Sequence, residues 1–309
     1  MAVAEHRGRV MASDLHVVIV DPQPEQLDLA LIQLEHLELL WSRFIETSDI
    51  SRLNRSGGGT VLVDDETLVL LASMIQAGAD TGGRFDPSVL PSLVDLGYAG
   101  SKEDPSARTV LSDGPYAGSI ADVELDAERG AVRLPRGLVL DPGGIGKGLA
   151  ADLVVAQLVE DGAAGALVSI GGDLVAAGVA PTPHGWTVGV EDPAMHDDLL
   201  CSLSFDGGGI ATSSTRSRRW AHDGAEVHHL IDPRTRRMSA TDLAQATVVA
   251  TTGWAAEAHA TAALLEGCDG VLDYLSERGL IGVAVGVDGT VLATDELRFA
   301  RELANGGPR

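Results

Sequence analysis

The chain has 309 residues, 45% of them hydrophobic and 22% charged, and its formal net charge at pH 7 is −23. A chain of this length can bury a large core, and its negative charge disfavours nucleic acid and anionic membrane surfaces as partners. Its two cysteines, Cys201 and Cys268, lack metal-ligand spacing, and no apolar run approaches the ~18 residues of a membrane helix. We therefore expect a globular protein that inserts into no membrane. Because the segment after Met1 has no apolar signal region, we expect it in the cytoplasm.

Hydrophobic patterns in the first half of the chain predict a mixture of strands and helices. Apolar residues from Leu27 to Trp41 recur with the helical period, which predicts a long helix. The expected elements, in chain order, are a strand at 15–20, a helix at 22–47, a short capped helix at 48–55, a helix at 65–79, a variable segment at 100–118 and a strand pair within 123–140.

A glycine-rich turn precedes a helix that we expect at 149–159. Residues 140–148 are Leu-Asp-Pro-Gly-Gly-Ile-Gly-Lys-Gly. Glycines let a backbone approach a ligand closely, and a helix N-terminus presents free N–H groups to an anion. The turn is therefore predicted to face a phosphate or pyrophosphate, with Lys147 as a point charge. A glycine-rich connection with an incidental lysine is the alternative.

Two familiar phosphate-binding motifs do not fit this turn. A P-loop needs Gly five residues before the Lys and Ser or Thr directly after it, where this chain has Pro142 and Gly148. A dinucleotide-binding fingerprint needs Gly-x-Gly-x-x-Gly after the first strand of a βαβ unit, whereas this turn lies in mid-chain with a different glycine spacing.

The second half of the chain continues the mixture of strands and helices. Because strict βαβ alternation is absent, we expect an α+β fold and not a doubly wound sheet. The expected elements are strands at 165–170, 186–190, 200–205 and 227–231, a helix at 253–265, and a hairpin at 281–293 that turns at Asp288-Gly289.

Nine short motifs lie at 11–13, 48–55, 83–88, 141–148, 169–173, 186–193, 210–213, 229–235 and 257–261. Taken in this order, they resemble the ApbE family of FAD:protein FMN transferases, and the resemblance extends from Met11 to about Gly267. The resemblance implies one catalytic domain over 1–309, with lobes at about 11–120 and 121–300, mixed sheets flanked by helices and a flavin cleft between the lobes. We expect residues 1–10 and 301–309 to be disordered tails.

The family binds FAD and Mg²⁺, and it transfers the FMN half of FAD to a Ser or Thr hydroxyl of an acceptor flavoprotein, releasing AMP. The resemblance implies a metal site formed by Glu257, Thr261 and the backbone carbonyl of Gly146. Glu257 and Thr261 lie four residues apart, on one face of the expected helix. Mg²⁺ prefers oxygen ligands. Glu257 is longer than the Asp that the family usually has here, so the sequence does not decide whether the bound metal is Mg²⁺ or Mn²⁺. The alternative is that Glu257 and Thr261 are simply two exposed polar residues on the helix and bind no metal.

His229 matches the histidine of the family's His-x-Ile-Asp-Pro element, and the resemblance implies that it is the general base. An imidazole suits this role because it titrates near neutrality. With His222 and His228, His229 could instead indicate zinc, which nothing else in the sequence supports. Phe44 stands where the family often has Tyr. The resemblance implies that Phe44 and Phe85 contact FAD, and the alternative is that both pack in the core. The implied contacts to FAD are Met11, Phe44, Phe85, Asp86, Pro87, Asp141, Gly144 and Lys147.

Ser214 and Arg236 stand where the family has Gly. The basic segment that follows Ser214, with Arg216, Arg218 and Arg219, could meet flavin phosphates or an acidic acceptor segment, or could be a solvated loop. These departures leave two other functions open. One is an FAD pyrophosphatase that yields FMN and AMP, and the other is a flavin-carrying protein without catalysis.

Overall fold

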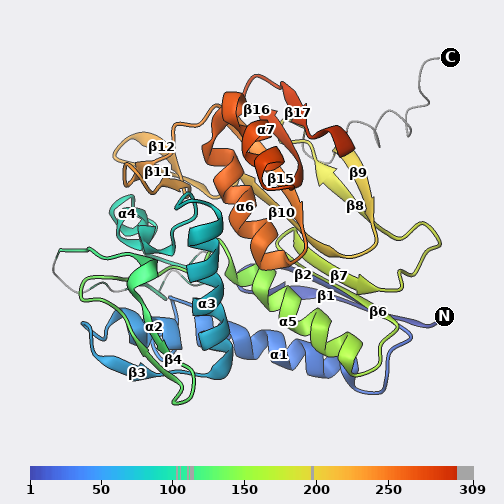
Figure 1. Cartoon of the computed structure of the whole chain (residues 1–309), viewed down its shortest axis with the longest axis horizontal. Coiled ribbons are helices and arrows are strands. Elements are labelled where there is room, and N and C mark those ends of the chain that lie inside the picture. Colours follow the sequence, from blue (N-terminus) through green and yellow to red (C-terminus); the bar gives the residue numbers. More distant parts are fainter. Residues whose placement is uncertain (102–103, 105, 110, 112–114, 196–197, 298–309) are drawn as a thin grey trace.

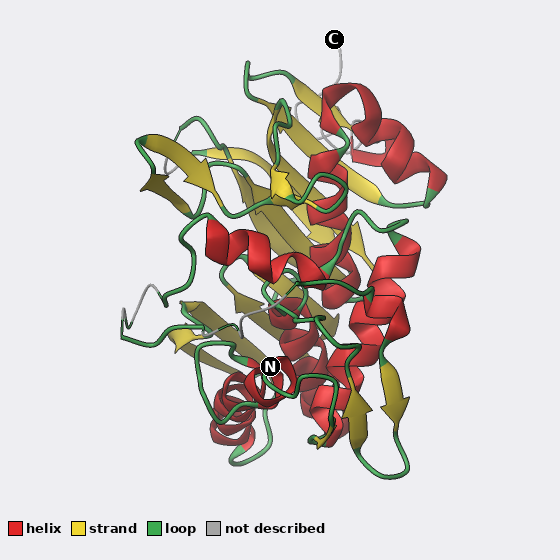
Figure 2. Cartoon of the chain, turned by 90° about the vertical axis from the view of Figure 1, so that its left-hand side faces the viewer, coloured by secondary structure: helices red, strands yellow, loops and turns green. Residues whose placement is uncertain are grey.

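One sheet of eight strands forms the centre of the protein, in a computed structural model that describes residues 1–101, 104, 106–109, 111, 115–195 and 198–297. All neighbouring strands in it are antiparallel. Strands extend along the whole height of the view in Figure 2. In spatial order they are β1 (Val3–Val10), β2 (Ser13–Val20), β6 (Gly165–Ile170), β7 (Asp173–Gly178), β10 (Gly208–Ser214), β15 (Leu243–Ala250), β16 (Ile281–Gly286) and β17 (Val291–Ala293).

Both faces of this sheet are covered, as the side chains of β2 illustrate. Val17 and Ile19 pack with the helices on one face, whereas Val18 and Val20 pack in a second core on the other face. This alternation follows from the period of two along a strand. The second face is covered by the hairpin of β8 (Trp186–Glu191) and β9 (Leu199–Phe205). The helices on the first face are α1 (Gln26–Trp41), α5 (Gly146–Glu160), α6 (Gly253–Leu265) and α7 (Gly267–Glu277) (Figure 1).

Smaller elements surround this layered core. A three-stranded sheet in the order β3-β5-β4 lies beside α2 and α3 (Figure 1). The helices are α2 (Asp49–Asn54), α3 (Asp65–Asp80) and α4 (Leu90–Asp95), with 3-10 turns η1 (Pro87–Val89) and η2 (Ile120–Asp122). The strands are β3 (Thr60–Leu62), β4 (Glu124–Asp126), β5 (Ala131–Arg133), β11 (Arg219–His222), β12 (Ala225–His228), β13 (Ile231–Asp232) and β14 (Arg237–Met238).

Several predicted elements are confirmed. The strand at 165–170 and the helix at 253–265 have the predicted ends, and the helix at 65–79 is one residue longer. The helix predicted at 22–47 is shorter at both ends, because Glu25 has a left-handed backbone and Ser42 an extended one. The helix predicted at 149–159 begins at Gly146, so the glycine motif itself forms the first turn of α5.

The expected N-terminal tail is wrong for residues 3–10, which pair with β2 along their whole length and form an edge strand. Residues 301–309 lie outside the described part of the chain. The predicted α+β class is confirmed. The lobe boundary predicted near residue 120 does not separate two sheets, because β2, before it, pairs with β6, after it. Among the described residues, no helix combines the length and apolar character needed to cross a membrane.

The start of α6 is fixed by a side chain from α5. Asp152 accepts hydrogen bonds from the backbone N–H groups of Gly253, at 2.8 Å, and Trp254, at 2.9 Å. Burial raises the pKa of Asp152 to about 6, so the carboxylate is ionised at pH 7. Two N–H groups that the helix itself cannot satisfy thereby find an acceptor. Asp152 therefore sets where the helix that carries Glu257 begins.

We expect Asp152→Ala to lower the free energy of unfolding by about 1–2 kcal/mol at pH 7, because two N–H groups at the start of α6 lose their acceptor. Urea unfolding measures this value. Glu160→Ala removes an exposed carboxylate from the same helix and is expected to leave stability nearly unchanged. Equal stability of the two variants would contradict the capping role.

Candidate functional site

Two adjacent cavities share the glycine turn as a wall. The first also lies against β10 and α6, and the second lies against the end of α1 and the segment that follows it. The first, here called the polar cavity, has a volume of about 280 Å³ and includes His229, Glu257 and Thr261 in its wall. The second, here called the aromatic cavity, has a volume of about 330 Å³ and includes Trp41 and Phe44. Six residues line both cavities and so mark their junction: Ala12, Tyr98, Asp141, Gly143, Lys147 and Arg218.

A buried ionic cluster lies at this junction. The Lys147 ammonium, in the first turn of α5, pairs with a carboxylate oxygen of Asp173 at 2.7 Å and with the Glu257 carboxylate. The second oxygen of Glu257 accepts a hydrogen bond from the backbone N–H of Gly148 at 2.8 Å. The side chains of Lys147, Asp173 and Glu257 are only 14%, 7% and 5% exposed. The cluster therefore ties α5, β7 and α6 together in the wall of the polar cavity.

Burial and neighbouring charge act in opposite directions on this cluster. Burial raises the pKa of Glu257 to about 7, and the nearby Lys147 ammonium opposes that rise. Burial alone would lower the pKa of Lys147, but the charges of Asp173 and Glu257 outweigh it and raise that pKa. Lys147 therefore stays protonated. It lines both cavities, and its charge is balanced by two buried carboxylates.

Thr261 lies one helical turn beyond Glu257, and its hydroxyl hydrogen-bonds to the hydroxyl of Ser213 at 3.0 Å. Both residues line the polar cavity. Asp173 and Glu257 add carboxylate oxygens to the same wall, where Lys147 and backbone N–H groups contact them, so these four side chains offer oxygen donors. This donor chemistry fits a hard cation such as Mg²⁺. Gly146, the third predicted ligand, lines the aromatic cavity.

Another group of metal-binding side chains lies outside the two cavities. In the described ranges, only His36, Asp64 and Glu66 bring three ligand atoms within 4.8 Å of one another. The three histidines of the zinc alternative form no such group there. His36 and Asp64 are exposed, and none of the three residues lines either cavity. Nothing else at that surface points to a bound ion.

The glycine turn is held by side chains on both sides. Asp141 accepts a hydrogen bond from the N–H of Gly143 at 2.9 Å and pairs with the buried Arg43 at 3.2 Å. Gly144 lies against the ring of Phe85, because a Cβ atom at this position would stand 3.2 Å from that ring. The turn is therefore rigidly supported, and its predicted FAD-contacting residues lie at the cavity walls.

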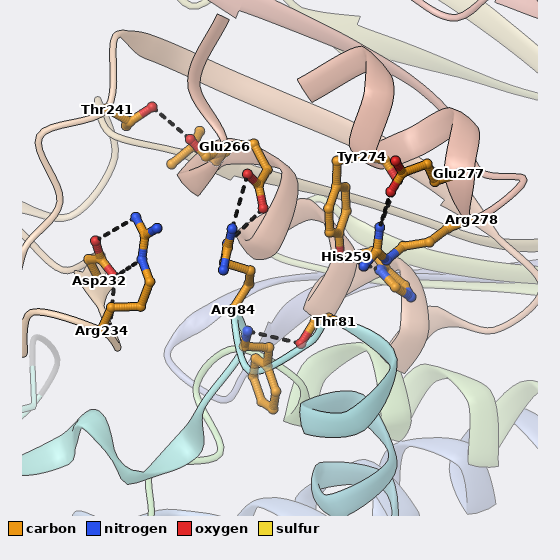
Figure 3. Close-up of polar contacts among 12 residues, drawn as sticks. Thr81, Arg84, Asp232, Arg234, Thr241, His259, Glu266, Tyr274, Glu277 and Arg278 are labelled. Atoms are coloured by element: carbon orange, nitrogen blue, oxygen red, sulfur yellow. Dashed lines mark hydrogen bonds and ion pairs between the residues drawn. The ribbon is translucent and has the colours of Figure 1, made fainter. Parts of the chain in front are cut away.

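The loop after α3 forms another wall of the polar cavity. The N–H of Phe85 donates to the Thr81 hydroxyl at 3.0 Å, and Arg84 reaches across to Glu266 at the end of α6, at 2.7 Å (Figure 3). Asp86 and Pro87 follow in the same wall. The Thr81 hydrogen bond and the Arg84–Glu266 ion pair therefore fix this loop, and the ion pair attaches it to the end of α6.

Arg236 explains one departure from the family motif. Its backbone has a φ of 57°, a left-handed conformation that glycine adopts most easily. Its guanidinium pairs with Asp86 at 3.3 Å and donates to the Ser88 carbonyl at 2.9 Å. The position thus tolerates Arg, which uses its side chain to fix the loop at 86–88.

His229 and His228 occupy different environments. The strand predicted at 227–231 is interrupted after His228, and His229 lies in the wall of the polar cavity. His228 is buried, its Nδ1 accepts a hydrogen bond from the N–H of Leu230 at 3.3 Å, and burial lowers its pKa. The break between β12 and β13 therefore separates the two histidines, and of the two only His229 lines the polar cavity.

The aromatic cavity contains a stack of rings around Arg43. The guanidinium carbon of Arg43 lies 4.1 Å from the centre of the Phe44 ring and 5.0 Å from that of Tyr98. Tyr98 in turn stacks on Trp220, with ring centres 5.2 Å apart. Met11 lines this cavity as well, whereas Phe85 lines the polar cavity. The two phenylalanines predicted to contact FAD therefore lie in different cavities.

Sequence reasoning missed three residues of this site. Asp173 follows two glycines in the motif at 169–173, but that motif does not predict its ion pair with Lys147. Arg43 and Tyr98 come from a helix end and a loop without any distinctive pattern. Only the Gly-Gly-Asp segment carried a signal that could have identified one of them.

Comparison with known proteins gives consistent matches over most of the chain. The ApbE family profile matches residues 11–284. The chain is similar to the FAD:protein FMN transferase of Salmonella typhimurium, with 26% identity over 80% of this chain and 73% of that protein. It is similar to the enzyme of the same name from Treponema pallidum, with 28% identity over 85% of this chain and 75% of that protein. An ApbE protein of Thermotoga maritima shares the fold, with a TM-score of 0.84, 24% identity and coverage of 96% and 99% of the two chains.

We expect Lys147→Met to lower the free energy of unfolding by about 3–5 kcal/mol, because it leaves two buried carboxylates without their cation. Adding Glu257→Gln to that variant is expected to recover part of the loss, since one of the unpaired charges is removed. Denaturant unfolding of the two single variants and the double variant measures the coupling. Strictly additive losses would show that the two side chains do not interact.

Proposed function

The chain belongs to the ApbE family, and we infer that it is an FAD:protein FMN transferase, as its similar curated relatives are named. We propose that it transfers the FMN moiety of FAD to a Ser or Thr hydroxyl of an acceptor flavoprotein and releases AMP. The observation that carries this proposal is the placement of His229, Glu257 and Thr261 in one cavity wall, beside a second cavity lined by aromatic rings.

The paired cavities suit the shape of FAD. This dinucleotide has two flat ring systems joined by a pyrophosphate, and the structure has two cavities that meet at the glycine turn. We propose that one ring system occupies each cavity and that the pyrophosphate crosses the junction near Gly143 and Lys147. Backbone N–H groups at the start of α5 favour an anion there. The predicted flavin cleft would then consist of both cavities.

We propose that the same wall binds Mg²⁺. Glu257 and Thr261 would hold the ion, with Asp173 as a further oxygen donor and the Gly146 carbonyl as the ligand that the resemblance implies. When bound, the ion neutralises charge on the phosphoryl oxygens. Lys147 would keep the pair of carboxylates close together before the ion arrives, since like charges at this distance otherwise repel.

The protein's own residues then position and deprotonate the acceptor. We propose that His229 takes the proton from the acceptor hydroxyl, whose oxygen forms a bond to the FMN phosphorus. The bond from that phosphorus to the bridging oxygen breaks, and AMP leaves with the bridging oxygen. The buried partners of Asp141 and Glu257 hold the glycine turn and α6 in place during this exchange.

We expect wild-type protein with FAD, Mg²⁺ and a Thr-bearing acceptor domain to form covalently flavinylated acceptor and AMP in equal amounts. His229→Ala is expected to slow transfer by at least about 10²-fold while FAD binding is retained, because only proton transfer is lost. His222→Ala removes a nearby histidine outside both cavities and serves as the control. Acceptor mass and AMP release are measured together.

Three results of that experiment would contradict the proposed function or the proposed role of His229. Free FMN and AMP in equal amounts with or without acceptor would identify an FAD pyrophosphatase. Tightly bound FAD with no products under excess Mg²⁺ would identify a flavin carrier. Undiminished transfer by His229→Ala would instead remove His229 from the reaction.

A further inference from the structure

The cationic side chains at the cavity walls are nearly all neutralised by acidic partners. This matters because a dianionic pyrophosphate bound at the junction requires positive charge that is not already paired. Lys147, the lysine of the glycine turn, does not supply it. The existing pairs are Arg43 with Asp141, Arg84 with Glu266, Lys147 with Asp173 and Glu257, and, nearby, Arg236 with Asp86.

Arg218 is the exception. It lines both cavities and is half-buried, and within the described ranges its guanidinium makes no ion pair or hydrogen bond. Its charge acts on Lys147, whose pKa it lowers in opposition to the two carboxylates. Arg218 therefore places an uncompensated positive charge at the junction of the two cavities.

The backbone around Arg218 is fixed by neighbouring contacts. Arg218 itself has a φ of 52°, an uncommon left-handed conformation for a residue with a side chain. Two residues later, Trp220 donates a hydrogen bond to the Leu96 carbonyl at 2.7 Å and stacks on Tyr98. This anchor holds strand β11 against the loop after α4. Arg218 is thereby kept at the cavity junction despite the cost of its backbone conformation.

We propose that Arg218 binds a phosphate group of FAD at the junction of the two cavities. This inference rests on the proposed function for the identity of the ligand. A guanidinium presents N–H donors in a fork that matches two phosphoryl oxygens, so its binding is specific for phosphate as well as electrostatic. Arg218 thus performs the role that the sequence assigned to Lys147, and it positions the pyrophosphate for attack at the FMN phosphorus.

The test compares FAD with riboflavin, which carries the flavin ring but neither the pyrophosphate nor the adenosine. We expect Arg218→Gln to weaken FAD binding by about 10- to 100-fold, the loss typical of a charged hydrogen bond, and to leave riboflavin binding unchanged. Arg218→Lys, which keeps the charge without the fork, is expected to fall between wild type and Arg218→Gln. Fluorescence titration gives the dissociation constants, and Arg216→Gln, an exposed arginine in the same segment, is the matched control.

Three results separate this proposal from its alternatives. Unchanged FAD affinity in Arg218→Gln would overturn the proposal. If that variant also had a raised KM for the acceptor, Arg218 would belong to the surface that binds the acceptor. An equal loss of riboflavin affinity would indicate a general structural role and would also overturn it. Phosphate-dependent loss of FAD affinity in a protein that flavinylates no acceptor would support Arg218 while refuting the transferase.

Discussion

The ion pairs of Lys147 with Asp173 and Glu257 connect the three elements on which the site is built. Lys147 lies in the first turn of α5, Asp173 begins β7 and Glu257 lies in α6. Two carboxylates buried this closely would repel one another without a cation between them. The ammonium therefore permits a buried, oxygen-rich wall at the point where the two cavities meet, and the other features of the site are arranged around it.

Small residues make this cluster possible. A Cβ atom at Gly148 would clash with the backbone of Gly253, and one at Gly253 would clash with that of Gly148, so the starts of α5 and α6 approach as closely as glycine allows. That approach lets the N–H of Gly148 reach the Glu257 carboxylate and lets Asp152 cap α6. The glycines of the central motif thus serve helix packing as well as access to a ligand.

Local patterns predicted the elements but not the pairing within the site. The helix at 253–265 and the glycine turn before α5 were found from periodicity and turn chemistry, since both are local properties. The Lys147–Glu257 contact joins residues 110 positions apart, which no local pattern encodes. Strand β1 was missed because its outward residues are exposed and only Val10 is buried, so its pairing with β2 depends on backbone hydrogen bonds.

The most direct test of this account is a crystal structure with FAD and Mn²⁺, whose anomalous scattering locates the ion in the site proposed for Mg²⁺. The account predicts an anomalous peak at coordination distance from Glu257 and Thr261, with the pyrophosphate at the junction of the two cavities. A peak at His36, Asp64 and Glu66, or none near Glu257 while FAD is bound, would contradict it.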